Sequence, residues 1–139
     1  MTLGKALRFI RRIYAIFYVI SGILIFSFLA GLTAMPELGI SAENAAFQRA
    51  LHATGFVVPI MATCYVASGL LMLFERTAAL GIVILGPFVV VILFTHLMLN
   101  GRPIWGAGHA LMLGIFAWQF RASYSLMWNK PTKKAQKNS

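Results

Sequence analysis

Four long stretches of this sequence carry no Asp, Glu, Lys or Arg side chain. A helix needs about 20 mostly apolar residues to cross the roughly 30 Å hydrocarbon core of a bilayer. Each stretch can supply such a helix, the last by continuing past Arg121, whose long side chain can reach the headgroups. We therefore expect an all-α protein, a transmembrane four-helix bundle over residues 1–128. Its spans are predicted at about residues 13–34, 56–74, 77–99 and 103–124.

The charges of the chain indicate a membrane environment rather than nucleic-acid binding. Only 11% of the residues are charged, whereas soluble domains average about 25%. The net charge of +9 comes from Lys and Arg residues that mostly flank the apolar stretches, where such residues hold helix ends at the membrane surface. Nucleic acid is therefore not an expected partner. The one cysteine, Cys64, excludes a disulfide within the chain and is interpreted as a packing residue.

The positive charges also predict an orientation, because cytoplasmic loops carry an excess of Lys and Arg. Ten such residues fall on the side of the two termini: Lys5, Arg8, Arg11, Arg12, Arg76, Arg121, Lys130, Lys133, Lys134 and Lys137. Only Arg49 and Arg102 fall on the other side. Both termini are therefore predicted to be cytoplasmic. Residues 129–139 are predicted to form a basic, disordered cytoplasmic tail that can touch anionic lipid.

Short turns join the last three stretches, whereas the first connection is long. Glu75-Arg76 and the Asn100-Gly101 turn signal each predict an antiparallel helix hairpin. Within the long connection, Ser41 is a suitable N-cap for a short amphipathic helix from Ala42 to Thr54, which Gly55 would end. We expect this helix to lie in the membrane interface or against the bundle. Its polar face carries Asn44, Gln48 and His52, and its apolar face carries Phe47, Ala50, Leu51 and Thr54.

Small residues predict where the helices approach one another, because lipid gives no hydrophobic drive for helix association. The expected packing residues are Gly106, Ala110 and Gly114 in the last span, closed by Trp118, with Ser27 and Gly31 in the first span and Ser68 and Gly69 in the second. Pro87 lies in the middle of the third span and predicts a kink, since proline removes a backbone hydrogen bond.

Histidine supplies the main candidates for chemistry. The chain has no Asp, and its three Glu residues lie between the predicted spans. His52, His96 and His109 all fall in the outer half, where they could share a metal or a haem iron; alternatively, each makes only local hydrogen bonds. Tyr65 lies inside a span and needs a hydrogen-bond partner. A further hypothesis is a quinone or other planar ligand bound by Tyr65, Trp118, His96 and His109.

The remaining aromatic residues near the ends of the spans have a simpler interpretation. Trp and Tyr are enriched at both membrane surfaces, where their rings sit at the level of the headgroups. The residues interpreted as such a belt are Tyr14, Tyr18, Trp105, Tyr124 and Trp128.

Three segments read ALHATGFVVPI at residues 50–60, SGLLMLFERTAALGIVILGPFVVVILFTHLML at 68–99 and FAWQFRASYSL at 116–126. On these segments, the whole chain resembles the DoxX-like family of four-helix membrane proteins, with the best match over residues 51–128. The matching positions are Thr54, Gly55, Pro59, Gly69, Arg76, Pro87, Ile92, His96, Trp118, Arg121 and Tyr124. The chain departs from the family where relatives often have polar side chains, at Ala34, Ala62, Tyr65 and Val91.

The resemblance implies a location in a bacterial inner membrane and a family associated with thiol, sulfur and quinone redox complexes. The missing polar residues argue against independent catalysis by this chain. The leading hypothesis is a non-catalytic accessory subunit that docks lipid, a membrane or periplasmic protein, or a second copy. One alternative is a membrane subunit of a quinone- or haem-linked redox system, with its ligand near His96 and His109. Another is a small-molecule transporter or channel, which the apolar spans disfavour.

Overall fold

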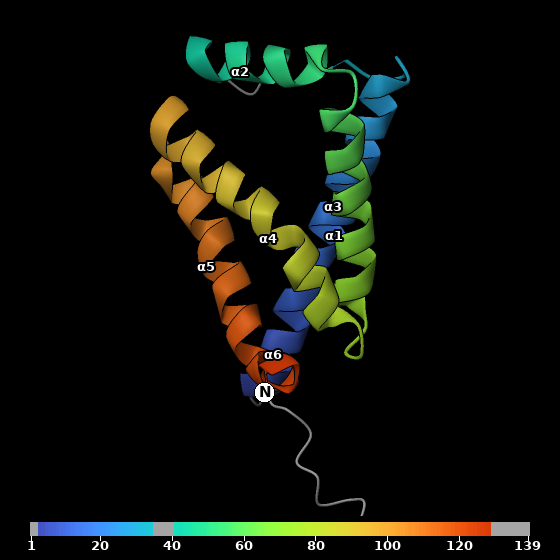
Figure 1. Ribbon diagram of the computed structural model, residues 1–139, viewed down its shortest axis with the longest axis vertical. Helices are drawn as coiled ribbons and strands as arrows, with labels where there is room; N and C mark the ends of the chain where they lie inside the picture. The colour runs from blue at the N-terminus through green and yellow to red at the C-terminus, as the bar shows by residue number, and fades with distance from the viewer. Residues whose placement is uncertain (1–2, 35–40, 129–139) are drawn as a thin grey trace, which may run out of the picture.

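The computed structural model describes residues 3–34 and 41–128, and within these ranges the chain consists of helices and short turns, without strands. The helices are α1 (Leu3–Leu29), α2 (Ala42–Ala53), α3 (Val57–Leu73), α4 (Ala78–Phe94), η1 (Thr95–Leu99), α5 (Pro103–Gln119) and α6 (Arg121–Trp128). The prediction of an all-α protein is confirmed. Contacts join α1 to α3, α3 to α4 and α4 to α5, and α2 lies across the end farthest from the N-terminus (Figure 1).

Two helices in the described part of the chain are long and apolar enough to cross a membrane. They are α1 and the continuous segment Ala78–Leu99, in which α4 runs through Pro87 into the π-helical turn η1. α3 and α5 have 17 residues each, which corresponds to about 25 Å of helix. α2 and α3 together are also apolar enough, but they meet at an angle of 94°, so α2 does not extend α3.

The predicted short helix between the first two spans is present as α2. The Ser41 side chain accepts a hydrogen bond from the Asn44 amide, as expected of an N-cap. Gly55, with φ at +75°, ends the helix. The Ser41 hydroxyl donates to the carbonyl of Leu99, and its amide donates to the Asn100 side chain at 3.2 Å. α2 therefore links the turn before α5 to the start of α3.

The burial of residues on α2 does not follow its amphipathic pattern. Asn44, which belongs to the polar face, is only 3% exposed, whereas Ala50 on the apolar face is exposed. The reason lies in the cap, because the bonds from Ser41 to Leu99 and Asn100 orient the first turn of α2 toward η1. Local amphipathicity is thus outweighed by a specific polar contact.

α1 and α3 pack backbone to backbone at two glycines. A Cβ atom at Gly69 would lie 2.7 Å from the carbonyl oxygen of Ala15, and one at Gly22 would lie 2.8 Å from that of Ala62. Only glycine permits two helices to approach so closely, which is how small residues promote helix association in lipid. Gly69 is a predicted packing residue, whereas Gly22 was not predicted.

Glycines also mediate the contacts of α4 with its two neighbours. A Cβ atom at Gly81 would lie 2.7 Å from the carbonyl oxygen of Ser68, a predicted packing residue that is fully buried. A Cβ atom at Gly106, another predicted packing residue, would lie 2.8 Å from the Cα atom of Leu93. Close backbone contacts therefore join α1 to α3, α3 to α4 and α4 to α5.

The other predicted packing residues lie elsewhere. Ser27 is half-buried, and its carbonyl accepts a bond from Leu32 in the turn that ends α1. Gly31 adopts a φ of +71° in that same turn. Ala110 is partly buried against the core, but a Cβ atom at Gly114 would meet nothing within 4 Å. The expected helix contacts at Gly31 and Gly114 are therefore wrong, because small size does not specify which face of a helix is covered.

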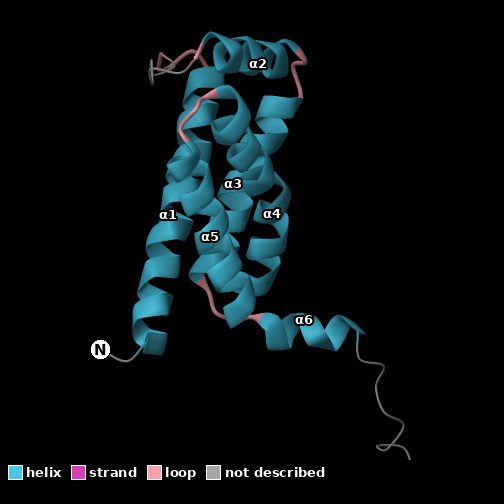
Figure 2. Cartoon of the chain, turned by 90° about the vertical axis from the view of Figure 1, so that its left-hand side faces the viewer, coloured by secondary structure: helices cyan, strands magenta, loops and turns pink. Residues whose placement is uncertain are grey.

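The expectation that the last span continues to Tyr124 is also wrong. α5 ends at Gln119, and Figure 2 shows α6 running across the end of the other helices. The Arg121 guanidinium donates to the carbonyl of Trp118, and the amides of Ser123 and Tyr124 bond back to the Phe120 carbonyl. Tyr124 then donates to the carbonyl of Ala79 at 3.1 Å. These bonds satisfy the polar groups that the break exposes.

A substitution at the α1–α3 contact tests this packing. Gly69→Ala should lower the free energy of unfolding by about 1–3 kcal/mol, because the new methyl group forces the two backbones apart. Denaturation of the detergent-solubilised protein measures the change. Gly108→Ala is the matched control, since a Cβ atom there meets nothing within 4 Å. Equal effects of the two substitutions would contradict the proposed contact.

Candidate functional site

Two tyrosines of α1 lie in the core rather than at a membrane surface. Tyr14 and Tyr18 are 8% and 1% exposed, so their interpretation as belt residues is wrong. They are four residues apart and share one face of α1 with Ala15 and Gly22, the residues that pack against α3. This face points inward along its whole length, which carries both phenols into the interior.

Both tyrosine hydroxyls contact His109 of α5. Tyr14 Oη donates to the backbone carbonyl of His109 at 3.0 Å, and Tyr18 Oη lies 3.1 Å from His109 Nδ1. The two hydroxyl oxygens are 3.4 Å apart. These bonds link α1 to α5, two helices that pack more extensively against α3 and α4 than against each other. Polar side chains make such links between helices in apolar surroundings.

Aromatic rings enclose the histidine on several sides. The ring of Phe17 lies 5.3 Å from the His109 ring between centroids, and Trp105 stacks on it at 6.5 Å and 26°. His109 is half-buried. Within residues 3–34 and 41–128, no hydrogen bond involves its Nε2 atom. The imidazole therefore presents one ring nitrogen that is free to bind a ligand.

Of the other predicted ligand-binding residues, only Tyr65 joins this cluster. Its ring packs edge-on against Tyr18 at 5.2 Å and against Phe88 at 5.7 Å. His96 lies in η1 and bonds through Nδ1 to the carbonyl of Ile92 at 3.0 Å. Trp118 lies on the outside of α5, 70% exposed, beneath the guanidinium of Arg121. The four residues therefore do not form one site.

The predicted three-histidine metal site is not formed. Among the residues that the structure describes, no three His, Cys, Asp or Glu side chains lie close enough to hold a metal ion. His52 is instead in edge-on contact with Phe28 of α1, at 5.5 Å between ring centroids.

A second cluster that the sequence reading missed lies near the N-terminal end of α1. Arg11 is 0% exposed and donates through Nη1 to Glu75 at 2.9 Å. Its guanidinium also lies over the ring of Phe120, 5.1 Å from the centroid. Nε and Nη2 of Arg11 have no hydrogen-bond partner among the described residues. Arg11 is thus a buried link between helices rather than a surface anchor.

One signal in the sequence could have found both clusters. Arg11, Tyr14, Tyr18 and Gly22 recur at spacings of three and four residues, the pattern of a single helix face. The predicted first span began at residue 13, which separated Arg11 from this face. α1 begins ten residues earlier, at Leu3, so the face extends through all four residues.

Comparison with known proteins assigns no family to this chain. No protein-family model, no curated protein and no solved structure matches it at a significant level. The clusters described above are therefore interpreted from their own geometry.

The Arg11–Glu75 pair predicts a dependence of stability on pH. The hydrogen bond from Arg11, with the charges of Arg11, Arg8 and Arg12, lowers the pKa of Glu75 below its ordinary value. Because the folded pKa is lowered, the stabilisation is complete above the unfolded value of about 4.3. It is lost as the pH falls through the lower folded value.

Glu75→Gln should remove this loss at acid pH and lower the free energy of unfolding at pH 7 by about 1–2 kcal/mol, since the amide keeps an acceptor but no charge. Denaturation at pH 7 and at a series of pH values below 4 measures both effects. Arg49→Gln is the control, because Arg49 is exposed and its side chain bonds only to a carbonyl of its own helix, α2. A Glu75→Gln protein with the same acid sensitivity as the wild type would show that the ion pair contributes nothing.

Proposed function

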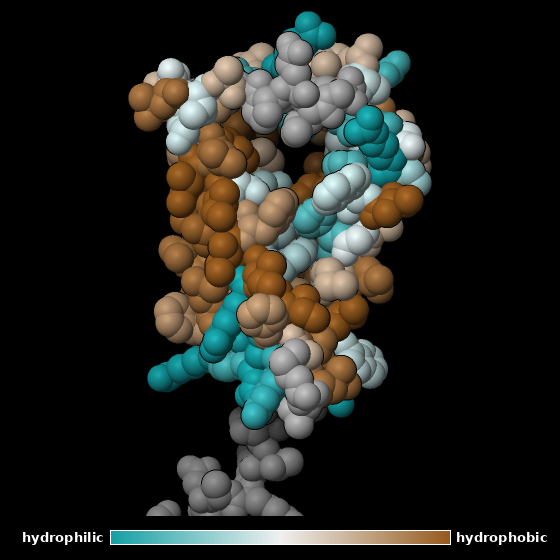
Figure 3. Space-filling model, turned by 180° about the vertical axis from the view of Figure 1, so that it is seen from behind, coloured by the Kyte–Doolittle hydropathy of each residue, from teal (hydrophilic) through white to brown (hydrophobic). Residues whose placement is uncertain are grey.

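We propose that this chain is a four-span protein of a bacterial inner membrane, with α1, α3, the α4–η1 segment and α5 as the spans. α1 and α4–η1 have the necessary length and composition. α3 and α5, at 17 residues each, are at the short end of the range observed for membrane helices. Each packs along one of the two longer helices. In Figure 3, apolar side chains cover the α1–α3 side of the molecule, at the left, whereas paler and hydrophilic side chains lie over the middle of this face.

The proposed orientation places both termini and α6 in the cytoplasm, and α2 outside. Arg8, Arg12, Arg76 and Arg121 lie at the end of the molecule opposite α2. A cytoplasmic location of that end follows the usual distribution of Lys and Arg. α6 then lies along the cytoplasmic surface, where Arg121 and its serines remain in contact with water.

Labelling of introduced cysteines tests this topology. In a Cys64→Ala background, Arg49→Cys in α2 should react with a membrane-impermeant maleimide in intact cells. Arg76→Cys, in the α3–α4 turn, should react only after the membrane is permeabilised, since the bilayer separates the two ends. Equal reactivity of both cysteines in intact cells would refute the topology.

We further propose that the protein acts as an accessory subunit that holds a lipophilic ligand, a quinone, at the cluster of Tyr14, Tyr18 and His109. The observation that supports this most is an ionisable side chain with a free ring nitrogen among apolar helices, since such groups in membranes commonly mark functional sites. The half-buried position of His109 gives access from the bilayer, and Phe17 and Trp105 supply flat apolar walls. The resemblance to the DoxX-like family is consistent with this proposal.

The hydrogen bonds favour a quinone over a haem at this position. Tyr14 uses its proton on the His109 carbonyl, and Tyr18 is closer to Nδ1 than to Tyr14 Oη. Donation from Tyr18 to Nδ1 leaves the imidazole proton on Nε2. Nε2–H can then donate to a carbonyl oxygen, whereas haem iron would need an unprotonated nitrogen there. A partner protein would supply the chemistry in which the quinone takes part.

Quenching of tryptophan fluorescence by decylubiquinone tests this proposal. In a protein whose only tryptophan is Trp105, obtained with Trp118→Phe and Trp128→Phe, saturable quenching should report binding beside His109. His109→Phe should weaken binding about fivefold, the effect of one lost hydrogen bond. His96→Gln is the control, because His96 bonds only within its own helix. Quenching that is linear in quinone, or equal weakening by both substitutions, would refute the site.

A further inference from the structure

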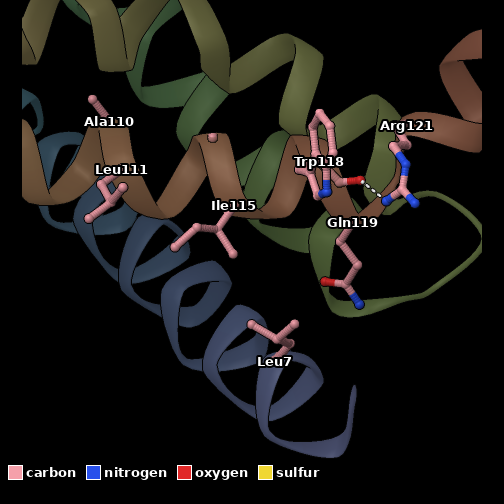
Figure 4. A pocket seen from close by; sticks show the side chains of 8 residues that line it. Leu7, Ala110, Leu111, Ile115, Trp118, Gln119 and Arg121 are labelled. Atoms are coloured by element: carbon pink, nitrogen blue, oxygen red, sulfur yellow. Dashed lines mark hydrogen bonds between the residues drawn. The ribbon is translucent and has the colours of Figure 1, made fainter. Parts of the chain in front are cut away.

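A groove lies between the first turns of α1 and the outer side of α5. It has a volume of about 620 Å³ and is open along one side. Leu7 forms one wall, and Figure 4 shows the lining side chains of α5 along the other. The lining residues are Leu7, Ala110, Leu111, Gly114, Ile115, Trp118, Gln119 and Arg121.

The middle of the groove is open because the residue there, Gly114, has no side chain. Gly114 lies at its centre, and a Cβ atom there would meet nothing within 4 Å. From Ala110 to Gln119 the groove follows nine residues of helix, or about 14 Å. This length is close to half of the hydrocarbon core, about 15 Å. The apolar part of the groove therefore matches one acyl chain in a single leaflet.

The end of the groove nearest α6 is polar and positively charged. The exposed guanidinium of Arg121 lies there. The only ion pair among residues 3–34 and 41–128 joins Arg11 to Glu75, so Arg121 has no acidic partner within those ranges. The Oε1 atom of Gln119 is buried without a hydrogen-bond partner in the same part of the chain. This end of the groove therefore contains an exposed cation and a buried acceptor without a partner.

We propose that the groove binds an anionic phospholipid with a hydroxyl-bearing headgroup, of the phosphatidylglycerol type. One acyl chain lies along Gly114 and Ala110, the phosphate pairs with Arg121, and a headgroup hydroxyl donates to Gln119 Oε1. The charge favours an anionic lipid, since each basic residue near an anionic surface contributes about 1 kcal/mol. The free acceptor favours a headgroup with a hydrogen-bond donor. The inference rests on the proposed membrane topology but not on the quinone site.

This site and the quinone site lie on different sides of α5. His109 and Phe116 face α1 and the core, whereas Gly114 and Trp118 face outward. Substitutions in the groove therefore leave the His109 cluster unchanged, and each proposal can fail without the other. An unchanged circular dichroism spectrum and an unchanged denaturation midpoint of the groove variants would show that the protein is folded.

Native mass spectrometry of the full chain in detergent, titrated with phosphatidylglycerol or chain-matched phosphatidylcholine, tests the proposal. Phosphatidylglycerol should bind the wild type with 1:1 stoichiometry and more tightly than phosphatidylcholine. Gly114→Leu should weaken it about tenfold, because the side chain displaces roughly two methylene groups of the lipid. Arg121→Gln should weaken it about fivefold and remove the preference over phosphatidylcholine.

Matched controls separate these effects from general ones. Gly108→Leu introduces the same side chain on the same helix, outside the groove and also in open space, and should bind lipid as the wild type does. Arg102→Gln removes a cation from the opposite end and should also have no effect. Equal binding of the two lipids by the wild type, or unchanged binding by Gly114→Leu, would overturn the proposal. A change of oligomeric state in Gly114→Leu alone would instead identify the groove as a self-association surface.

Discussion

The contact of α1 with α3 at Gly22 and Gly69 determines how the rest of the molecule is arranged. Each glycine lies where a Cβ atom would collide with a carbonyl oxygen of the other helix, at Ala62 and at Ala15. In lipid such close contacts replace the hydrophobic effect as the source of helix association. The contact also fixes the rotation of α1 about its own axis. With α1 in this rotation, Tyr14 and Tyr18, which lie beside Ala15, reach His109 of α5.

Polar side chains link the helices that the glycine contacts do not bring together. α1 and α5 are linked chiefly through side chains, by the Tyr14 and Tyr18 bonds to His109 and by the stacking of Arg11 on Phe120. Burying a guanidinium is costly unless it is paired, and Glu75, half-exposed in the α3–α4 turn, supplies the charge. The same ion pair joins α1 to that turn. At the opposite end, Ser41 ties α2 to the turn before α5.

α5 carries both proposed binding sites because its two sides have different environments. Its inner side packs closely against α4 at Gly106 and contacts the tyrosines at His109. His109 is the polar position on this side. Its outer side is open around Gly114 and ends at Arg121, where the chain turns into α6.

The sequence alone determined the helical class, the hairpin turns and the α2 helix with its Ser41 cap. These features depend on hydropathy and on hydrogen bonds between near neighbours, which a short segment contains in full. It also identified His109 and Tyr65 as candidates, since polar groups are conspicuous in apolar stretches. The sequence did not show which residues His109 and Tyr65 contact. Its charge and aromatic patterns wrongly indicated that Tyr14, Tyr18 and Arg11 lie at the membrane surface.

Only the tertiary structure decided which face of each helix is covered. Gly69 and Gly114 are both glycines in apolar helices, yet one touches a backbone and the other faces open space. Trp118 and Tyr18 are both aromatic, yet one is 70% exposed and the other 1%. These differences follow from helix rotation and from pairing between residues as distant as Tyr18 and His109. Local spacing can indicate which residues share a helix face, but not which distant residues that face contacts, because those contacts depend on how all the helices pack together.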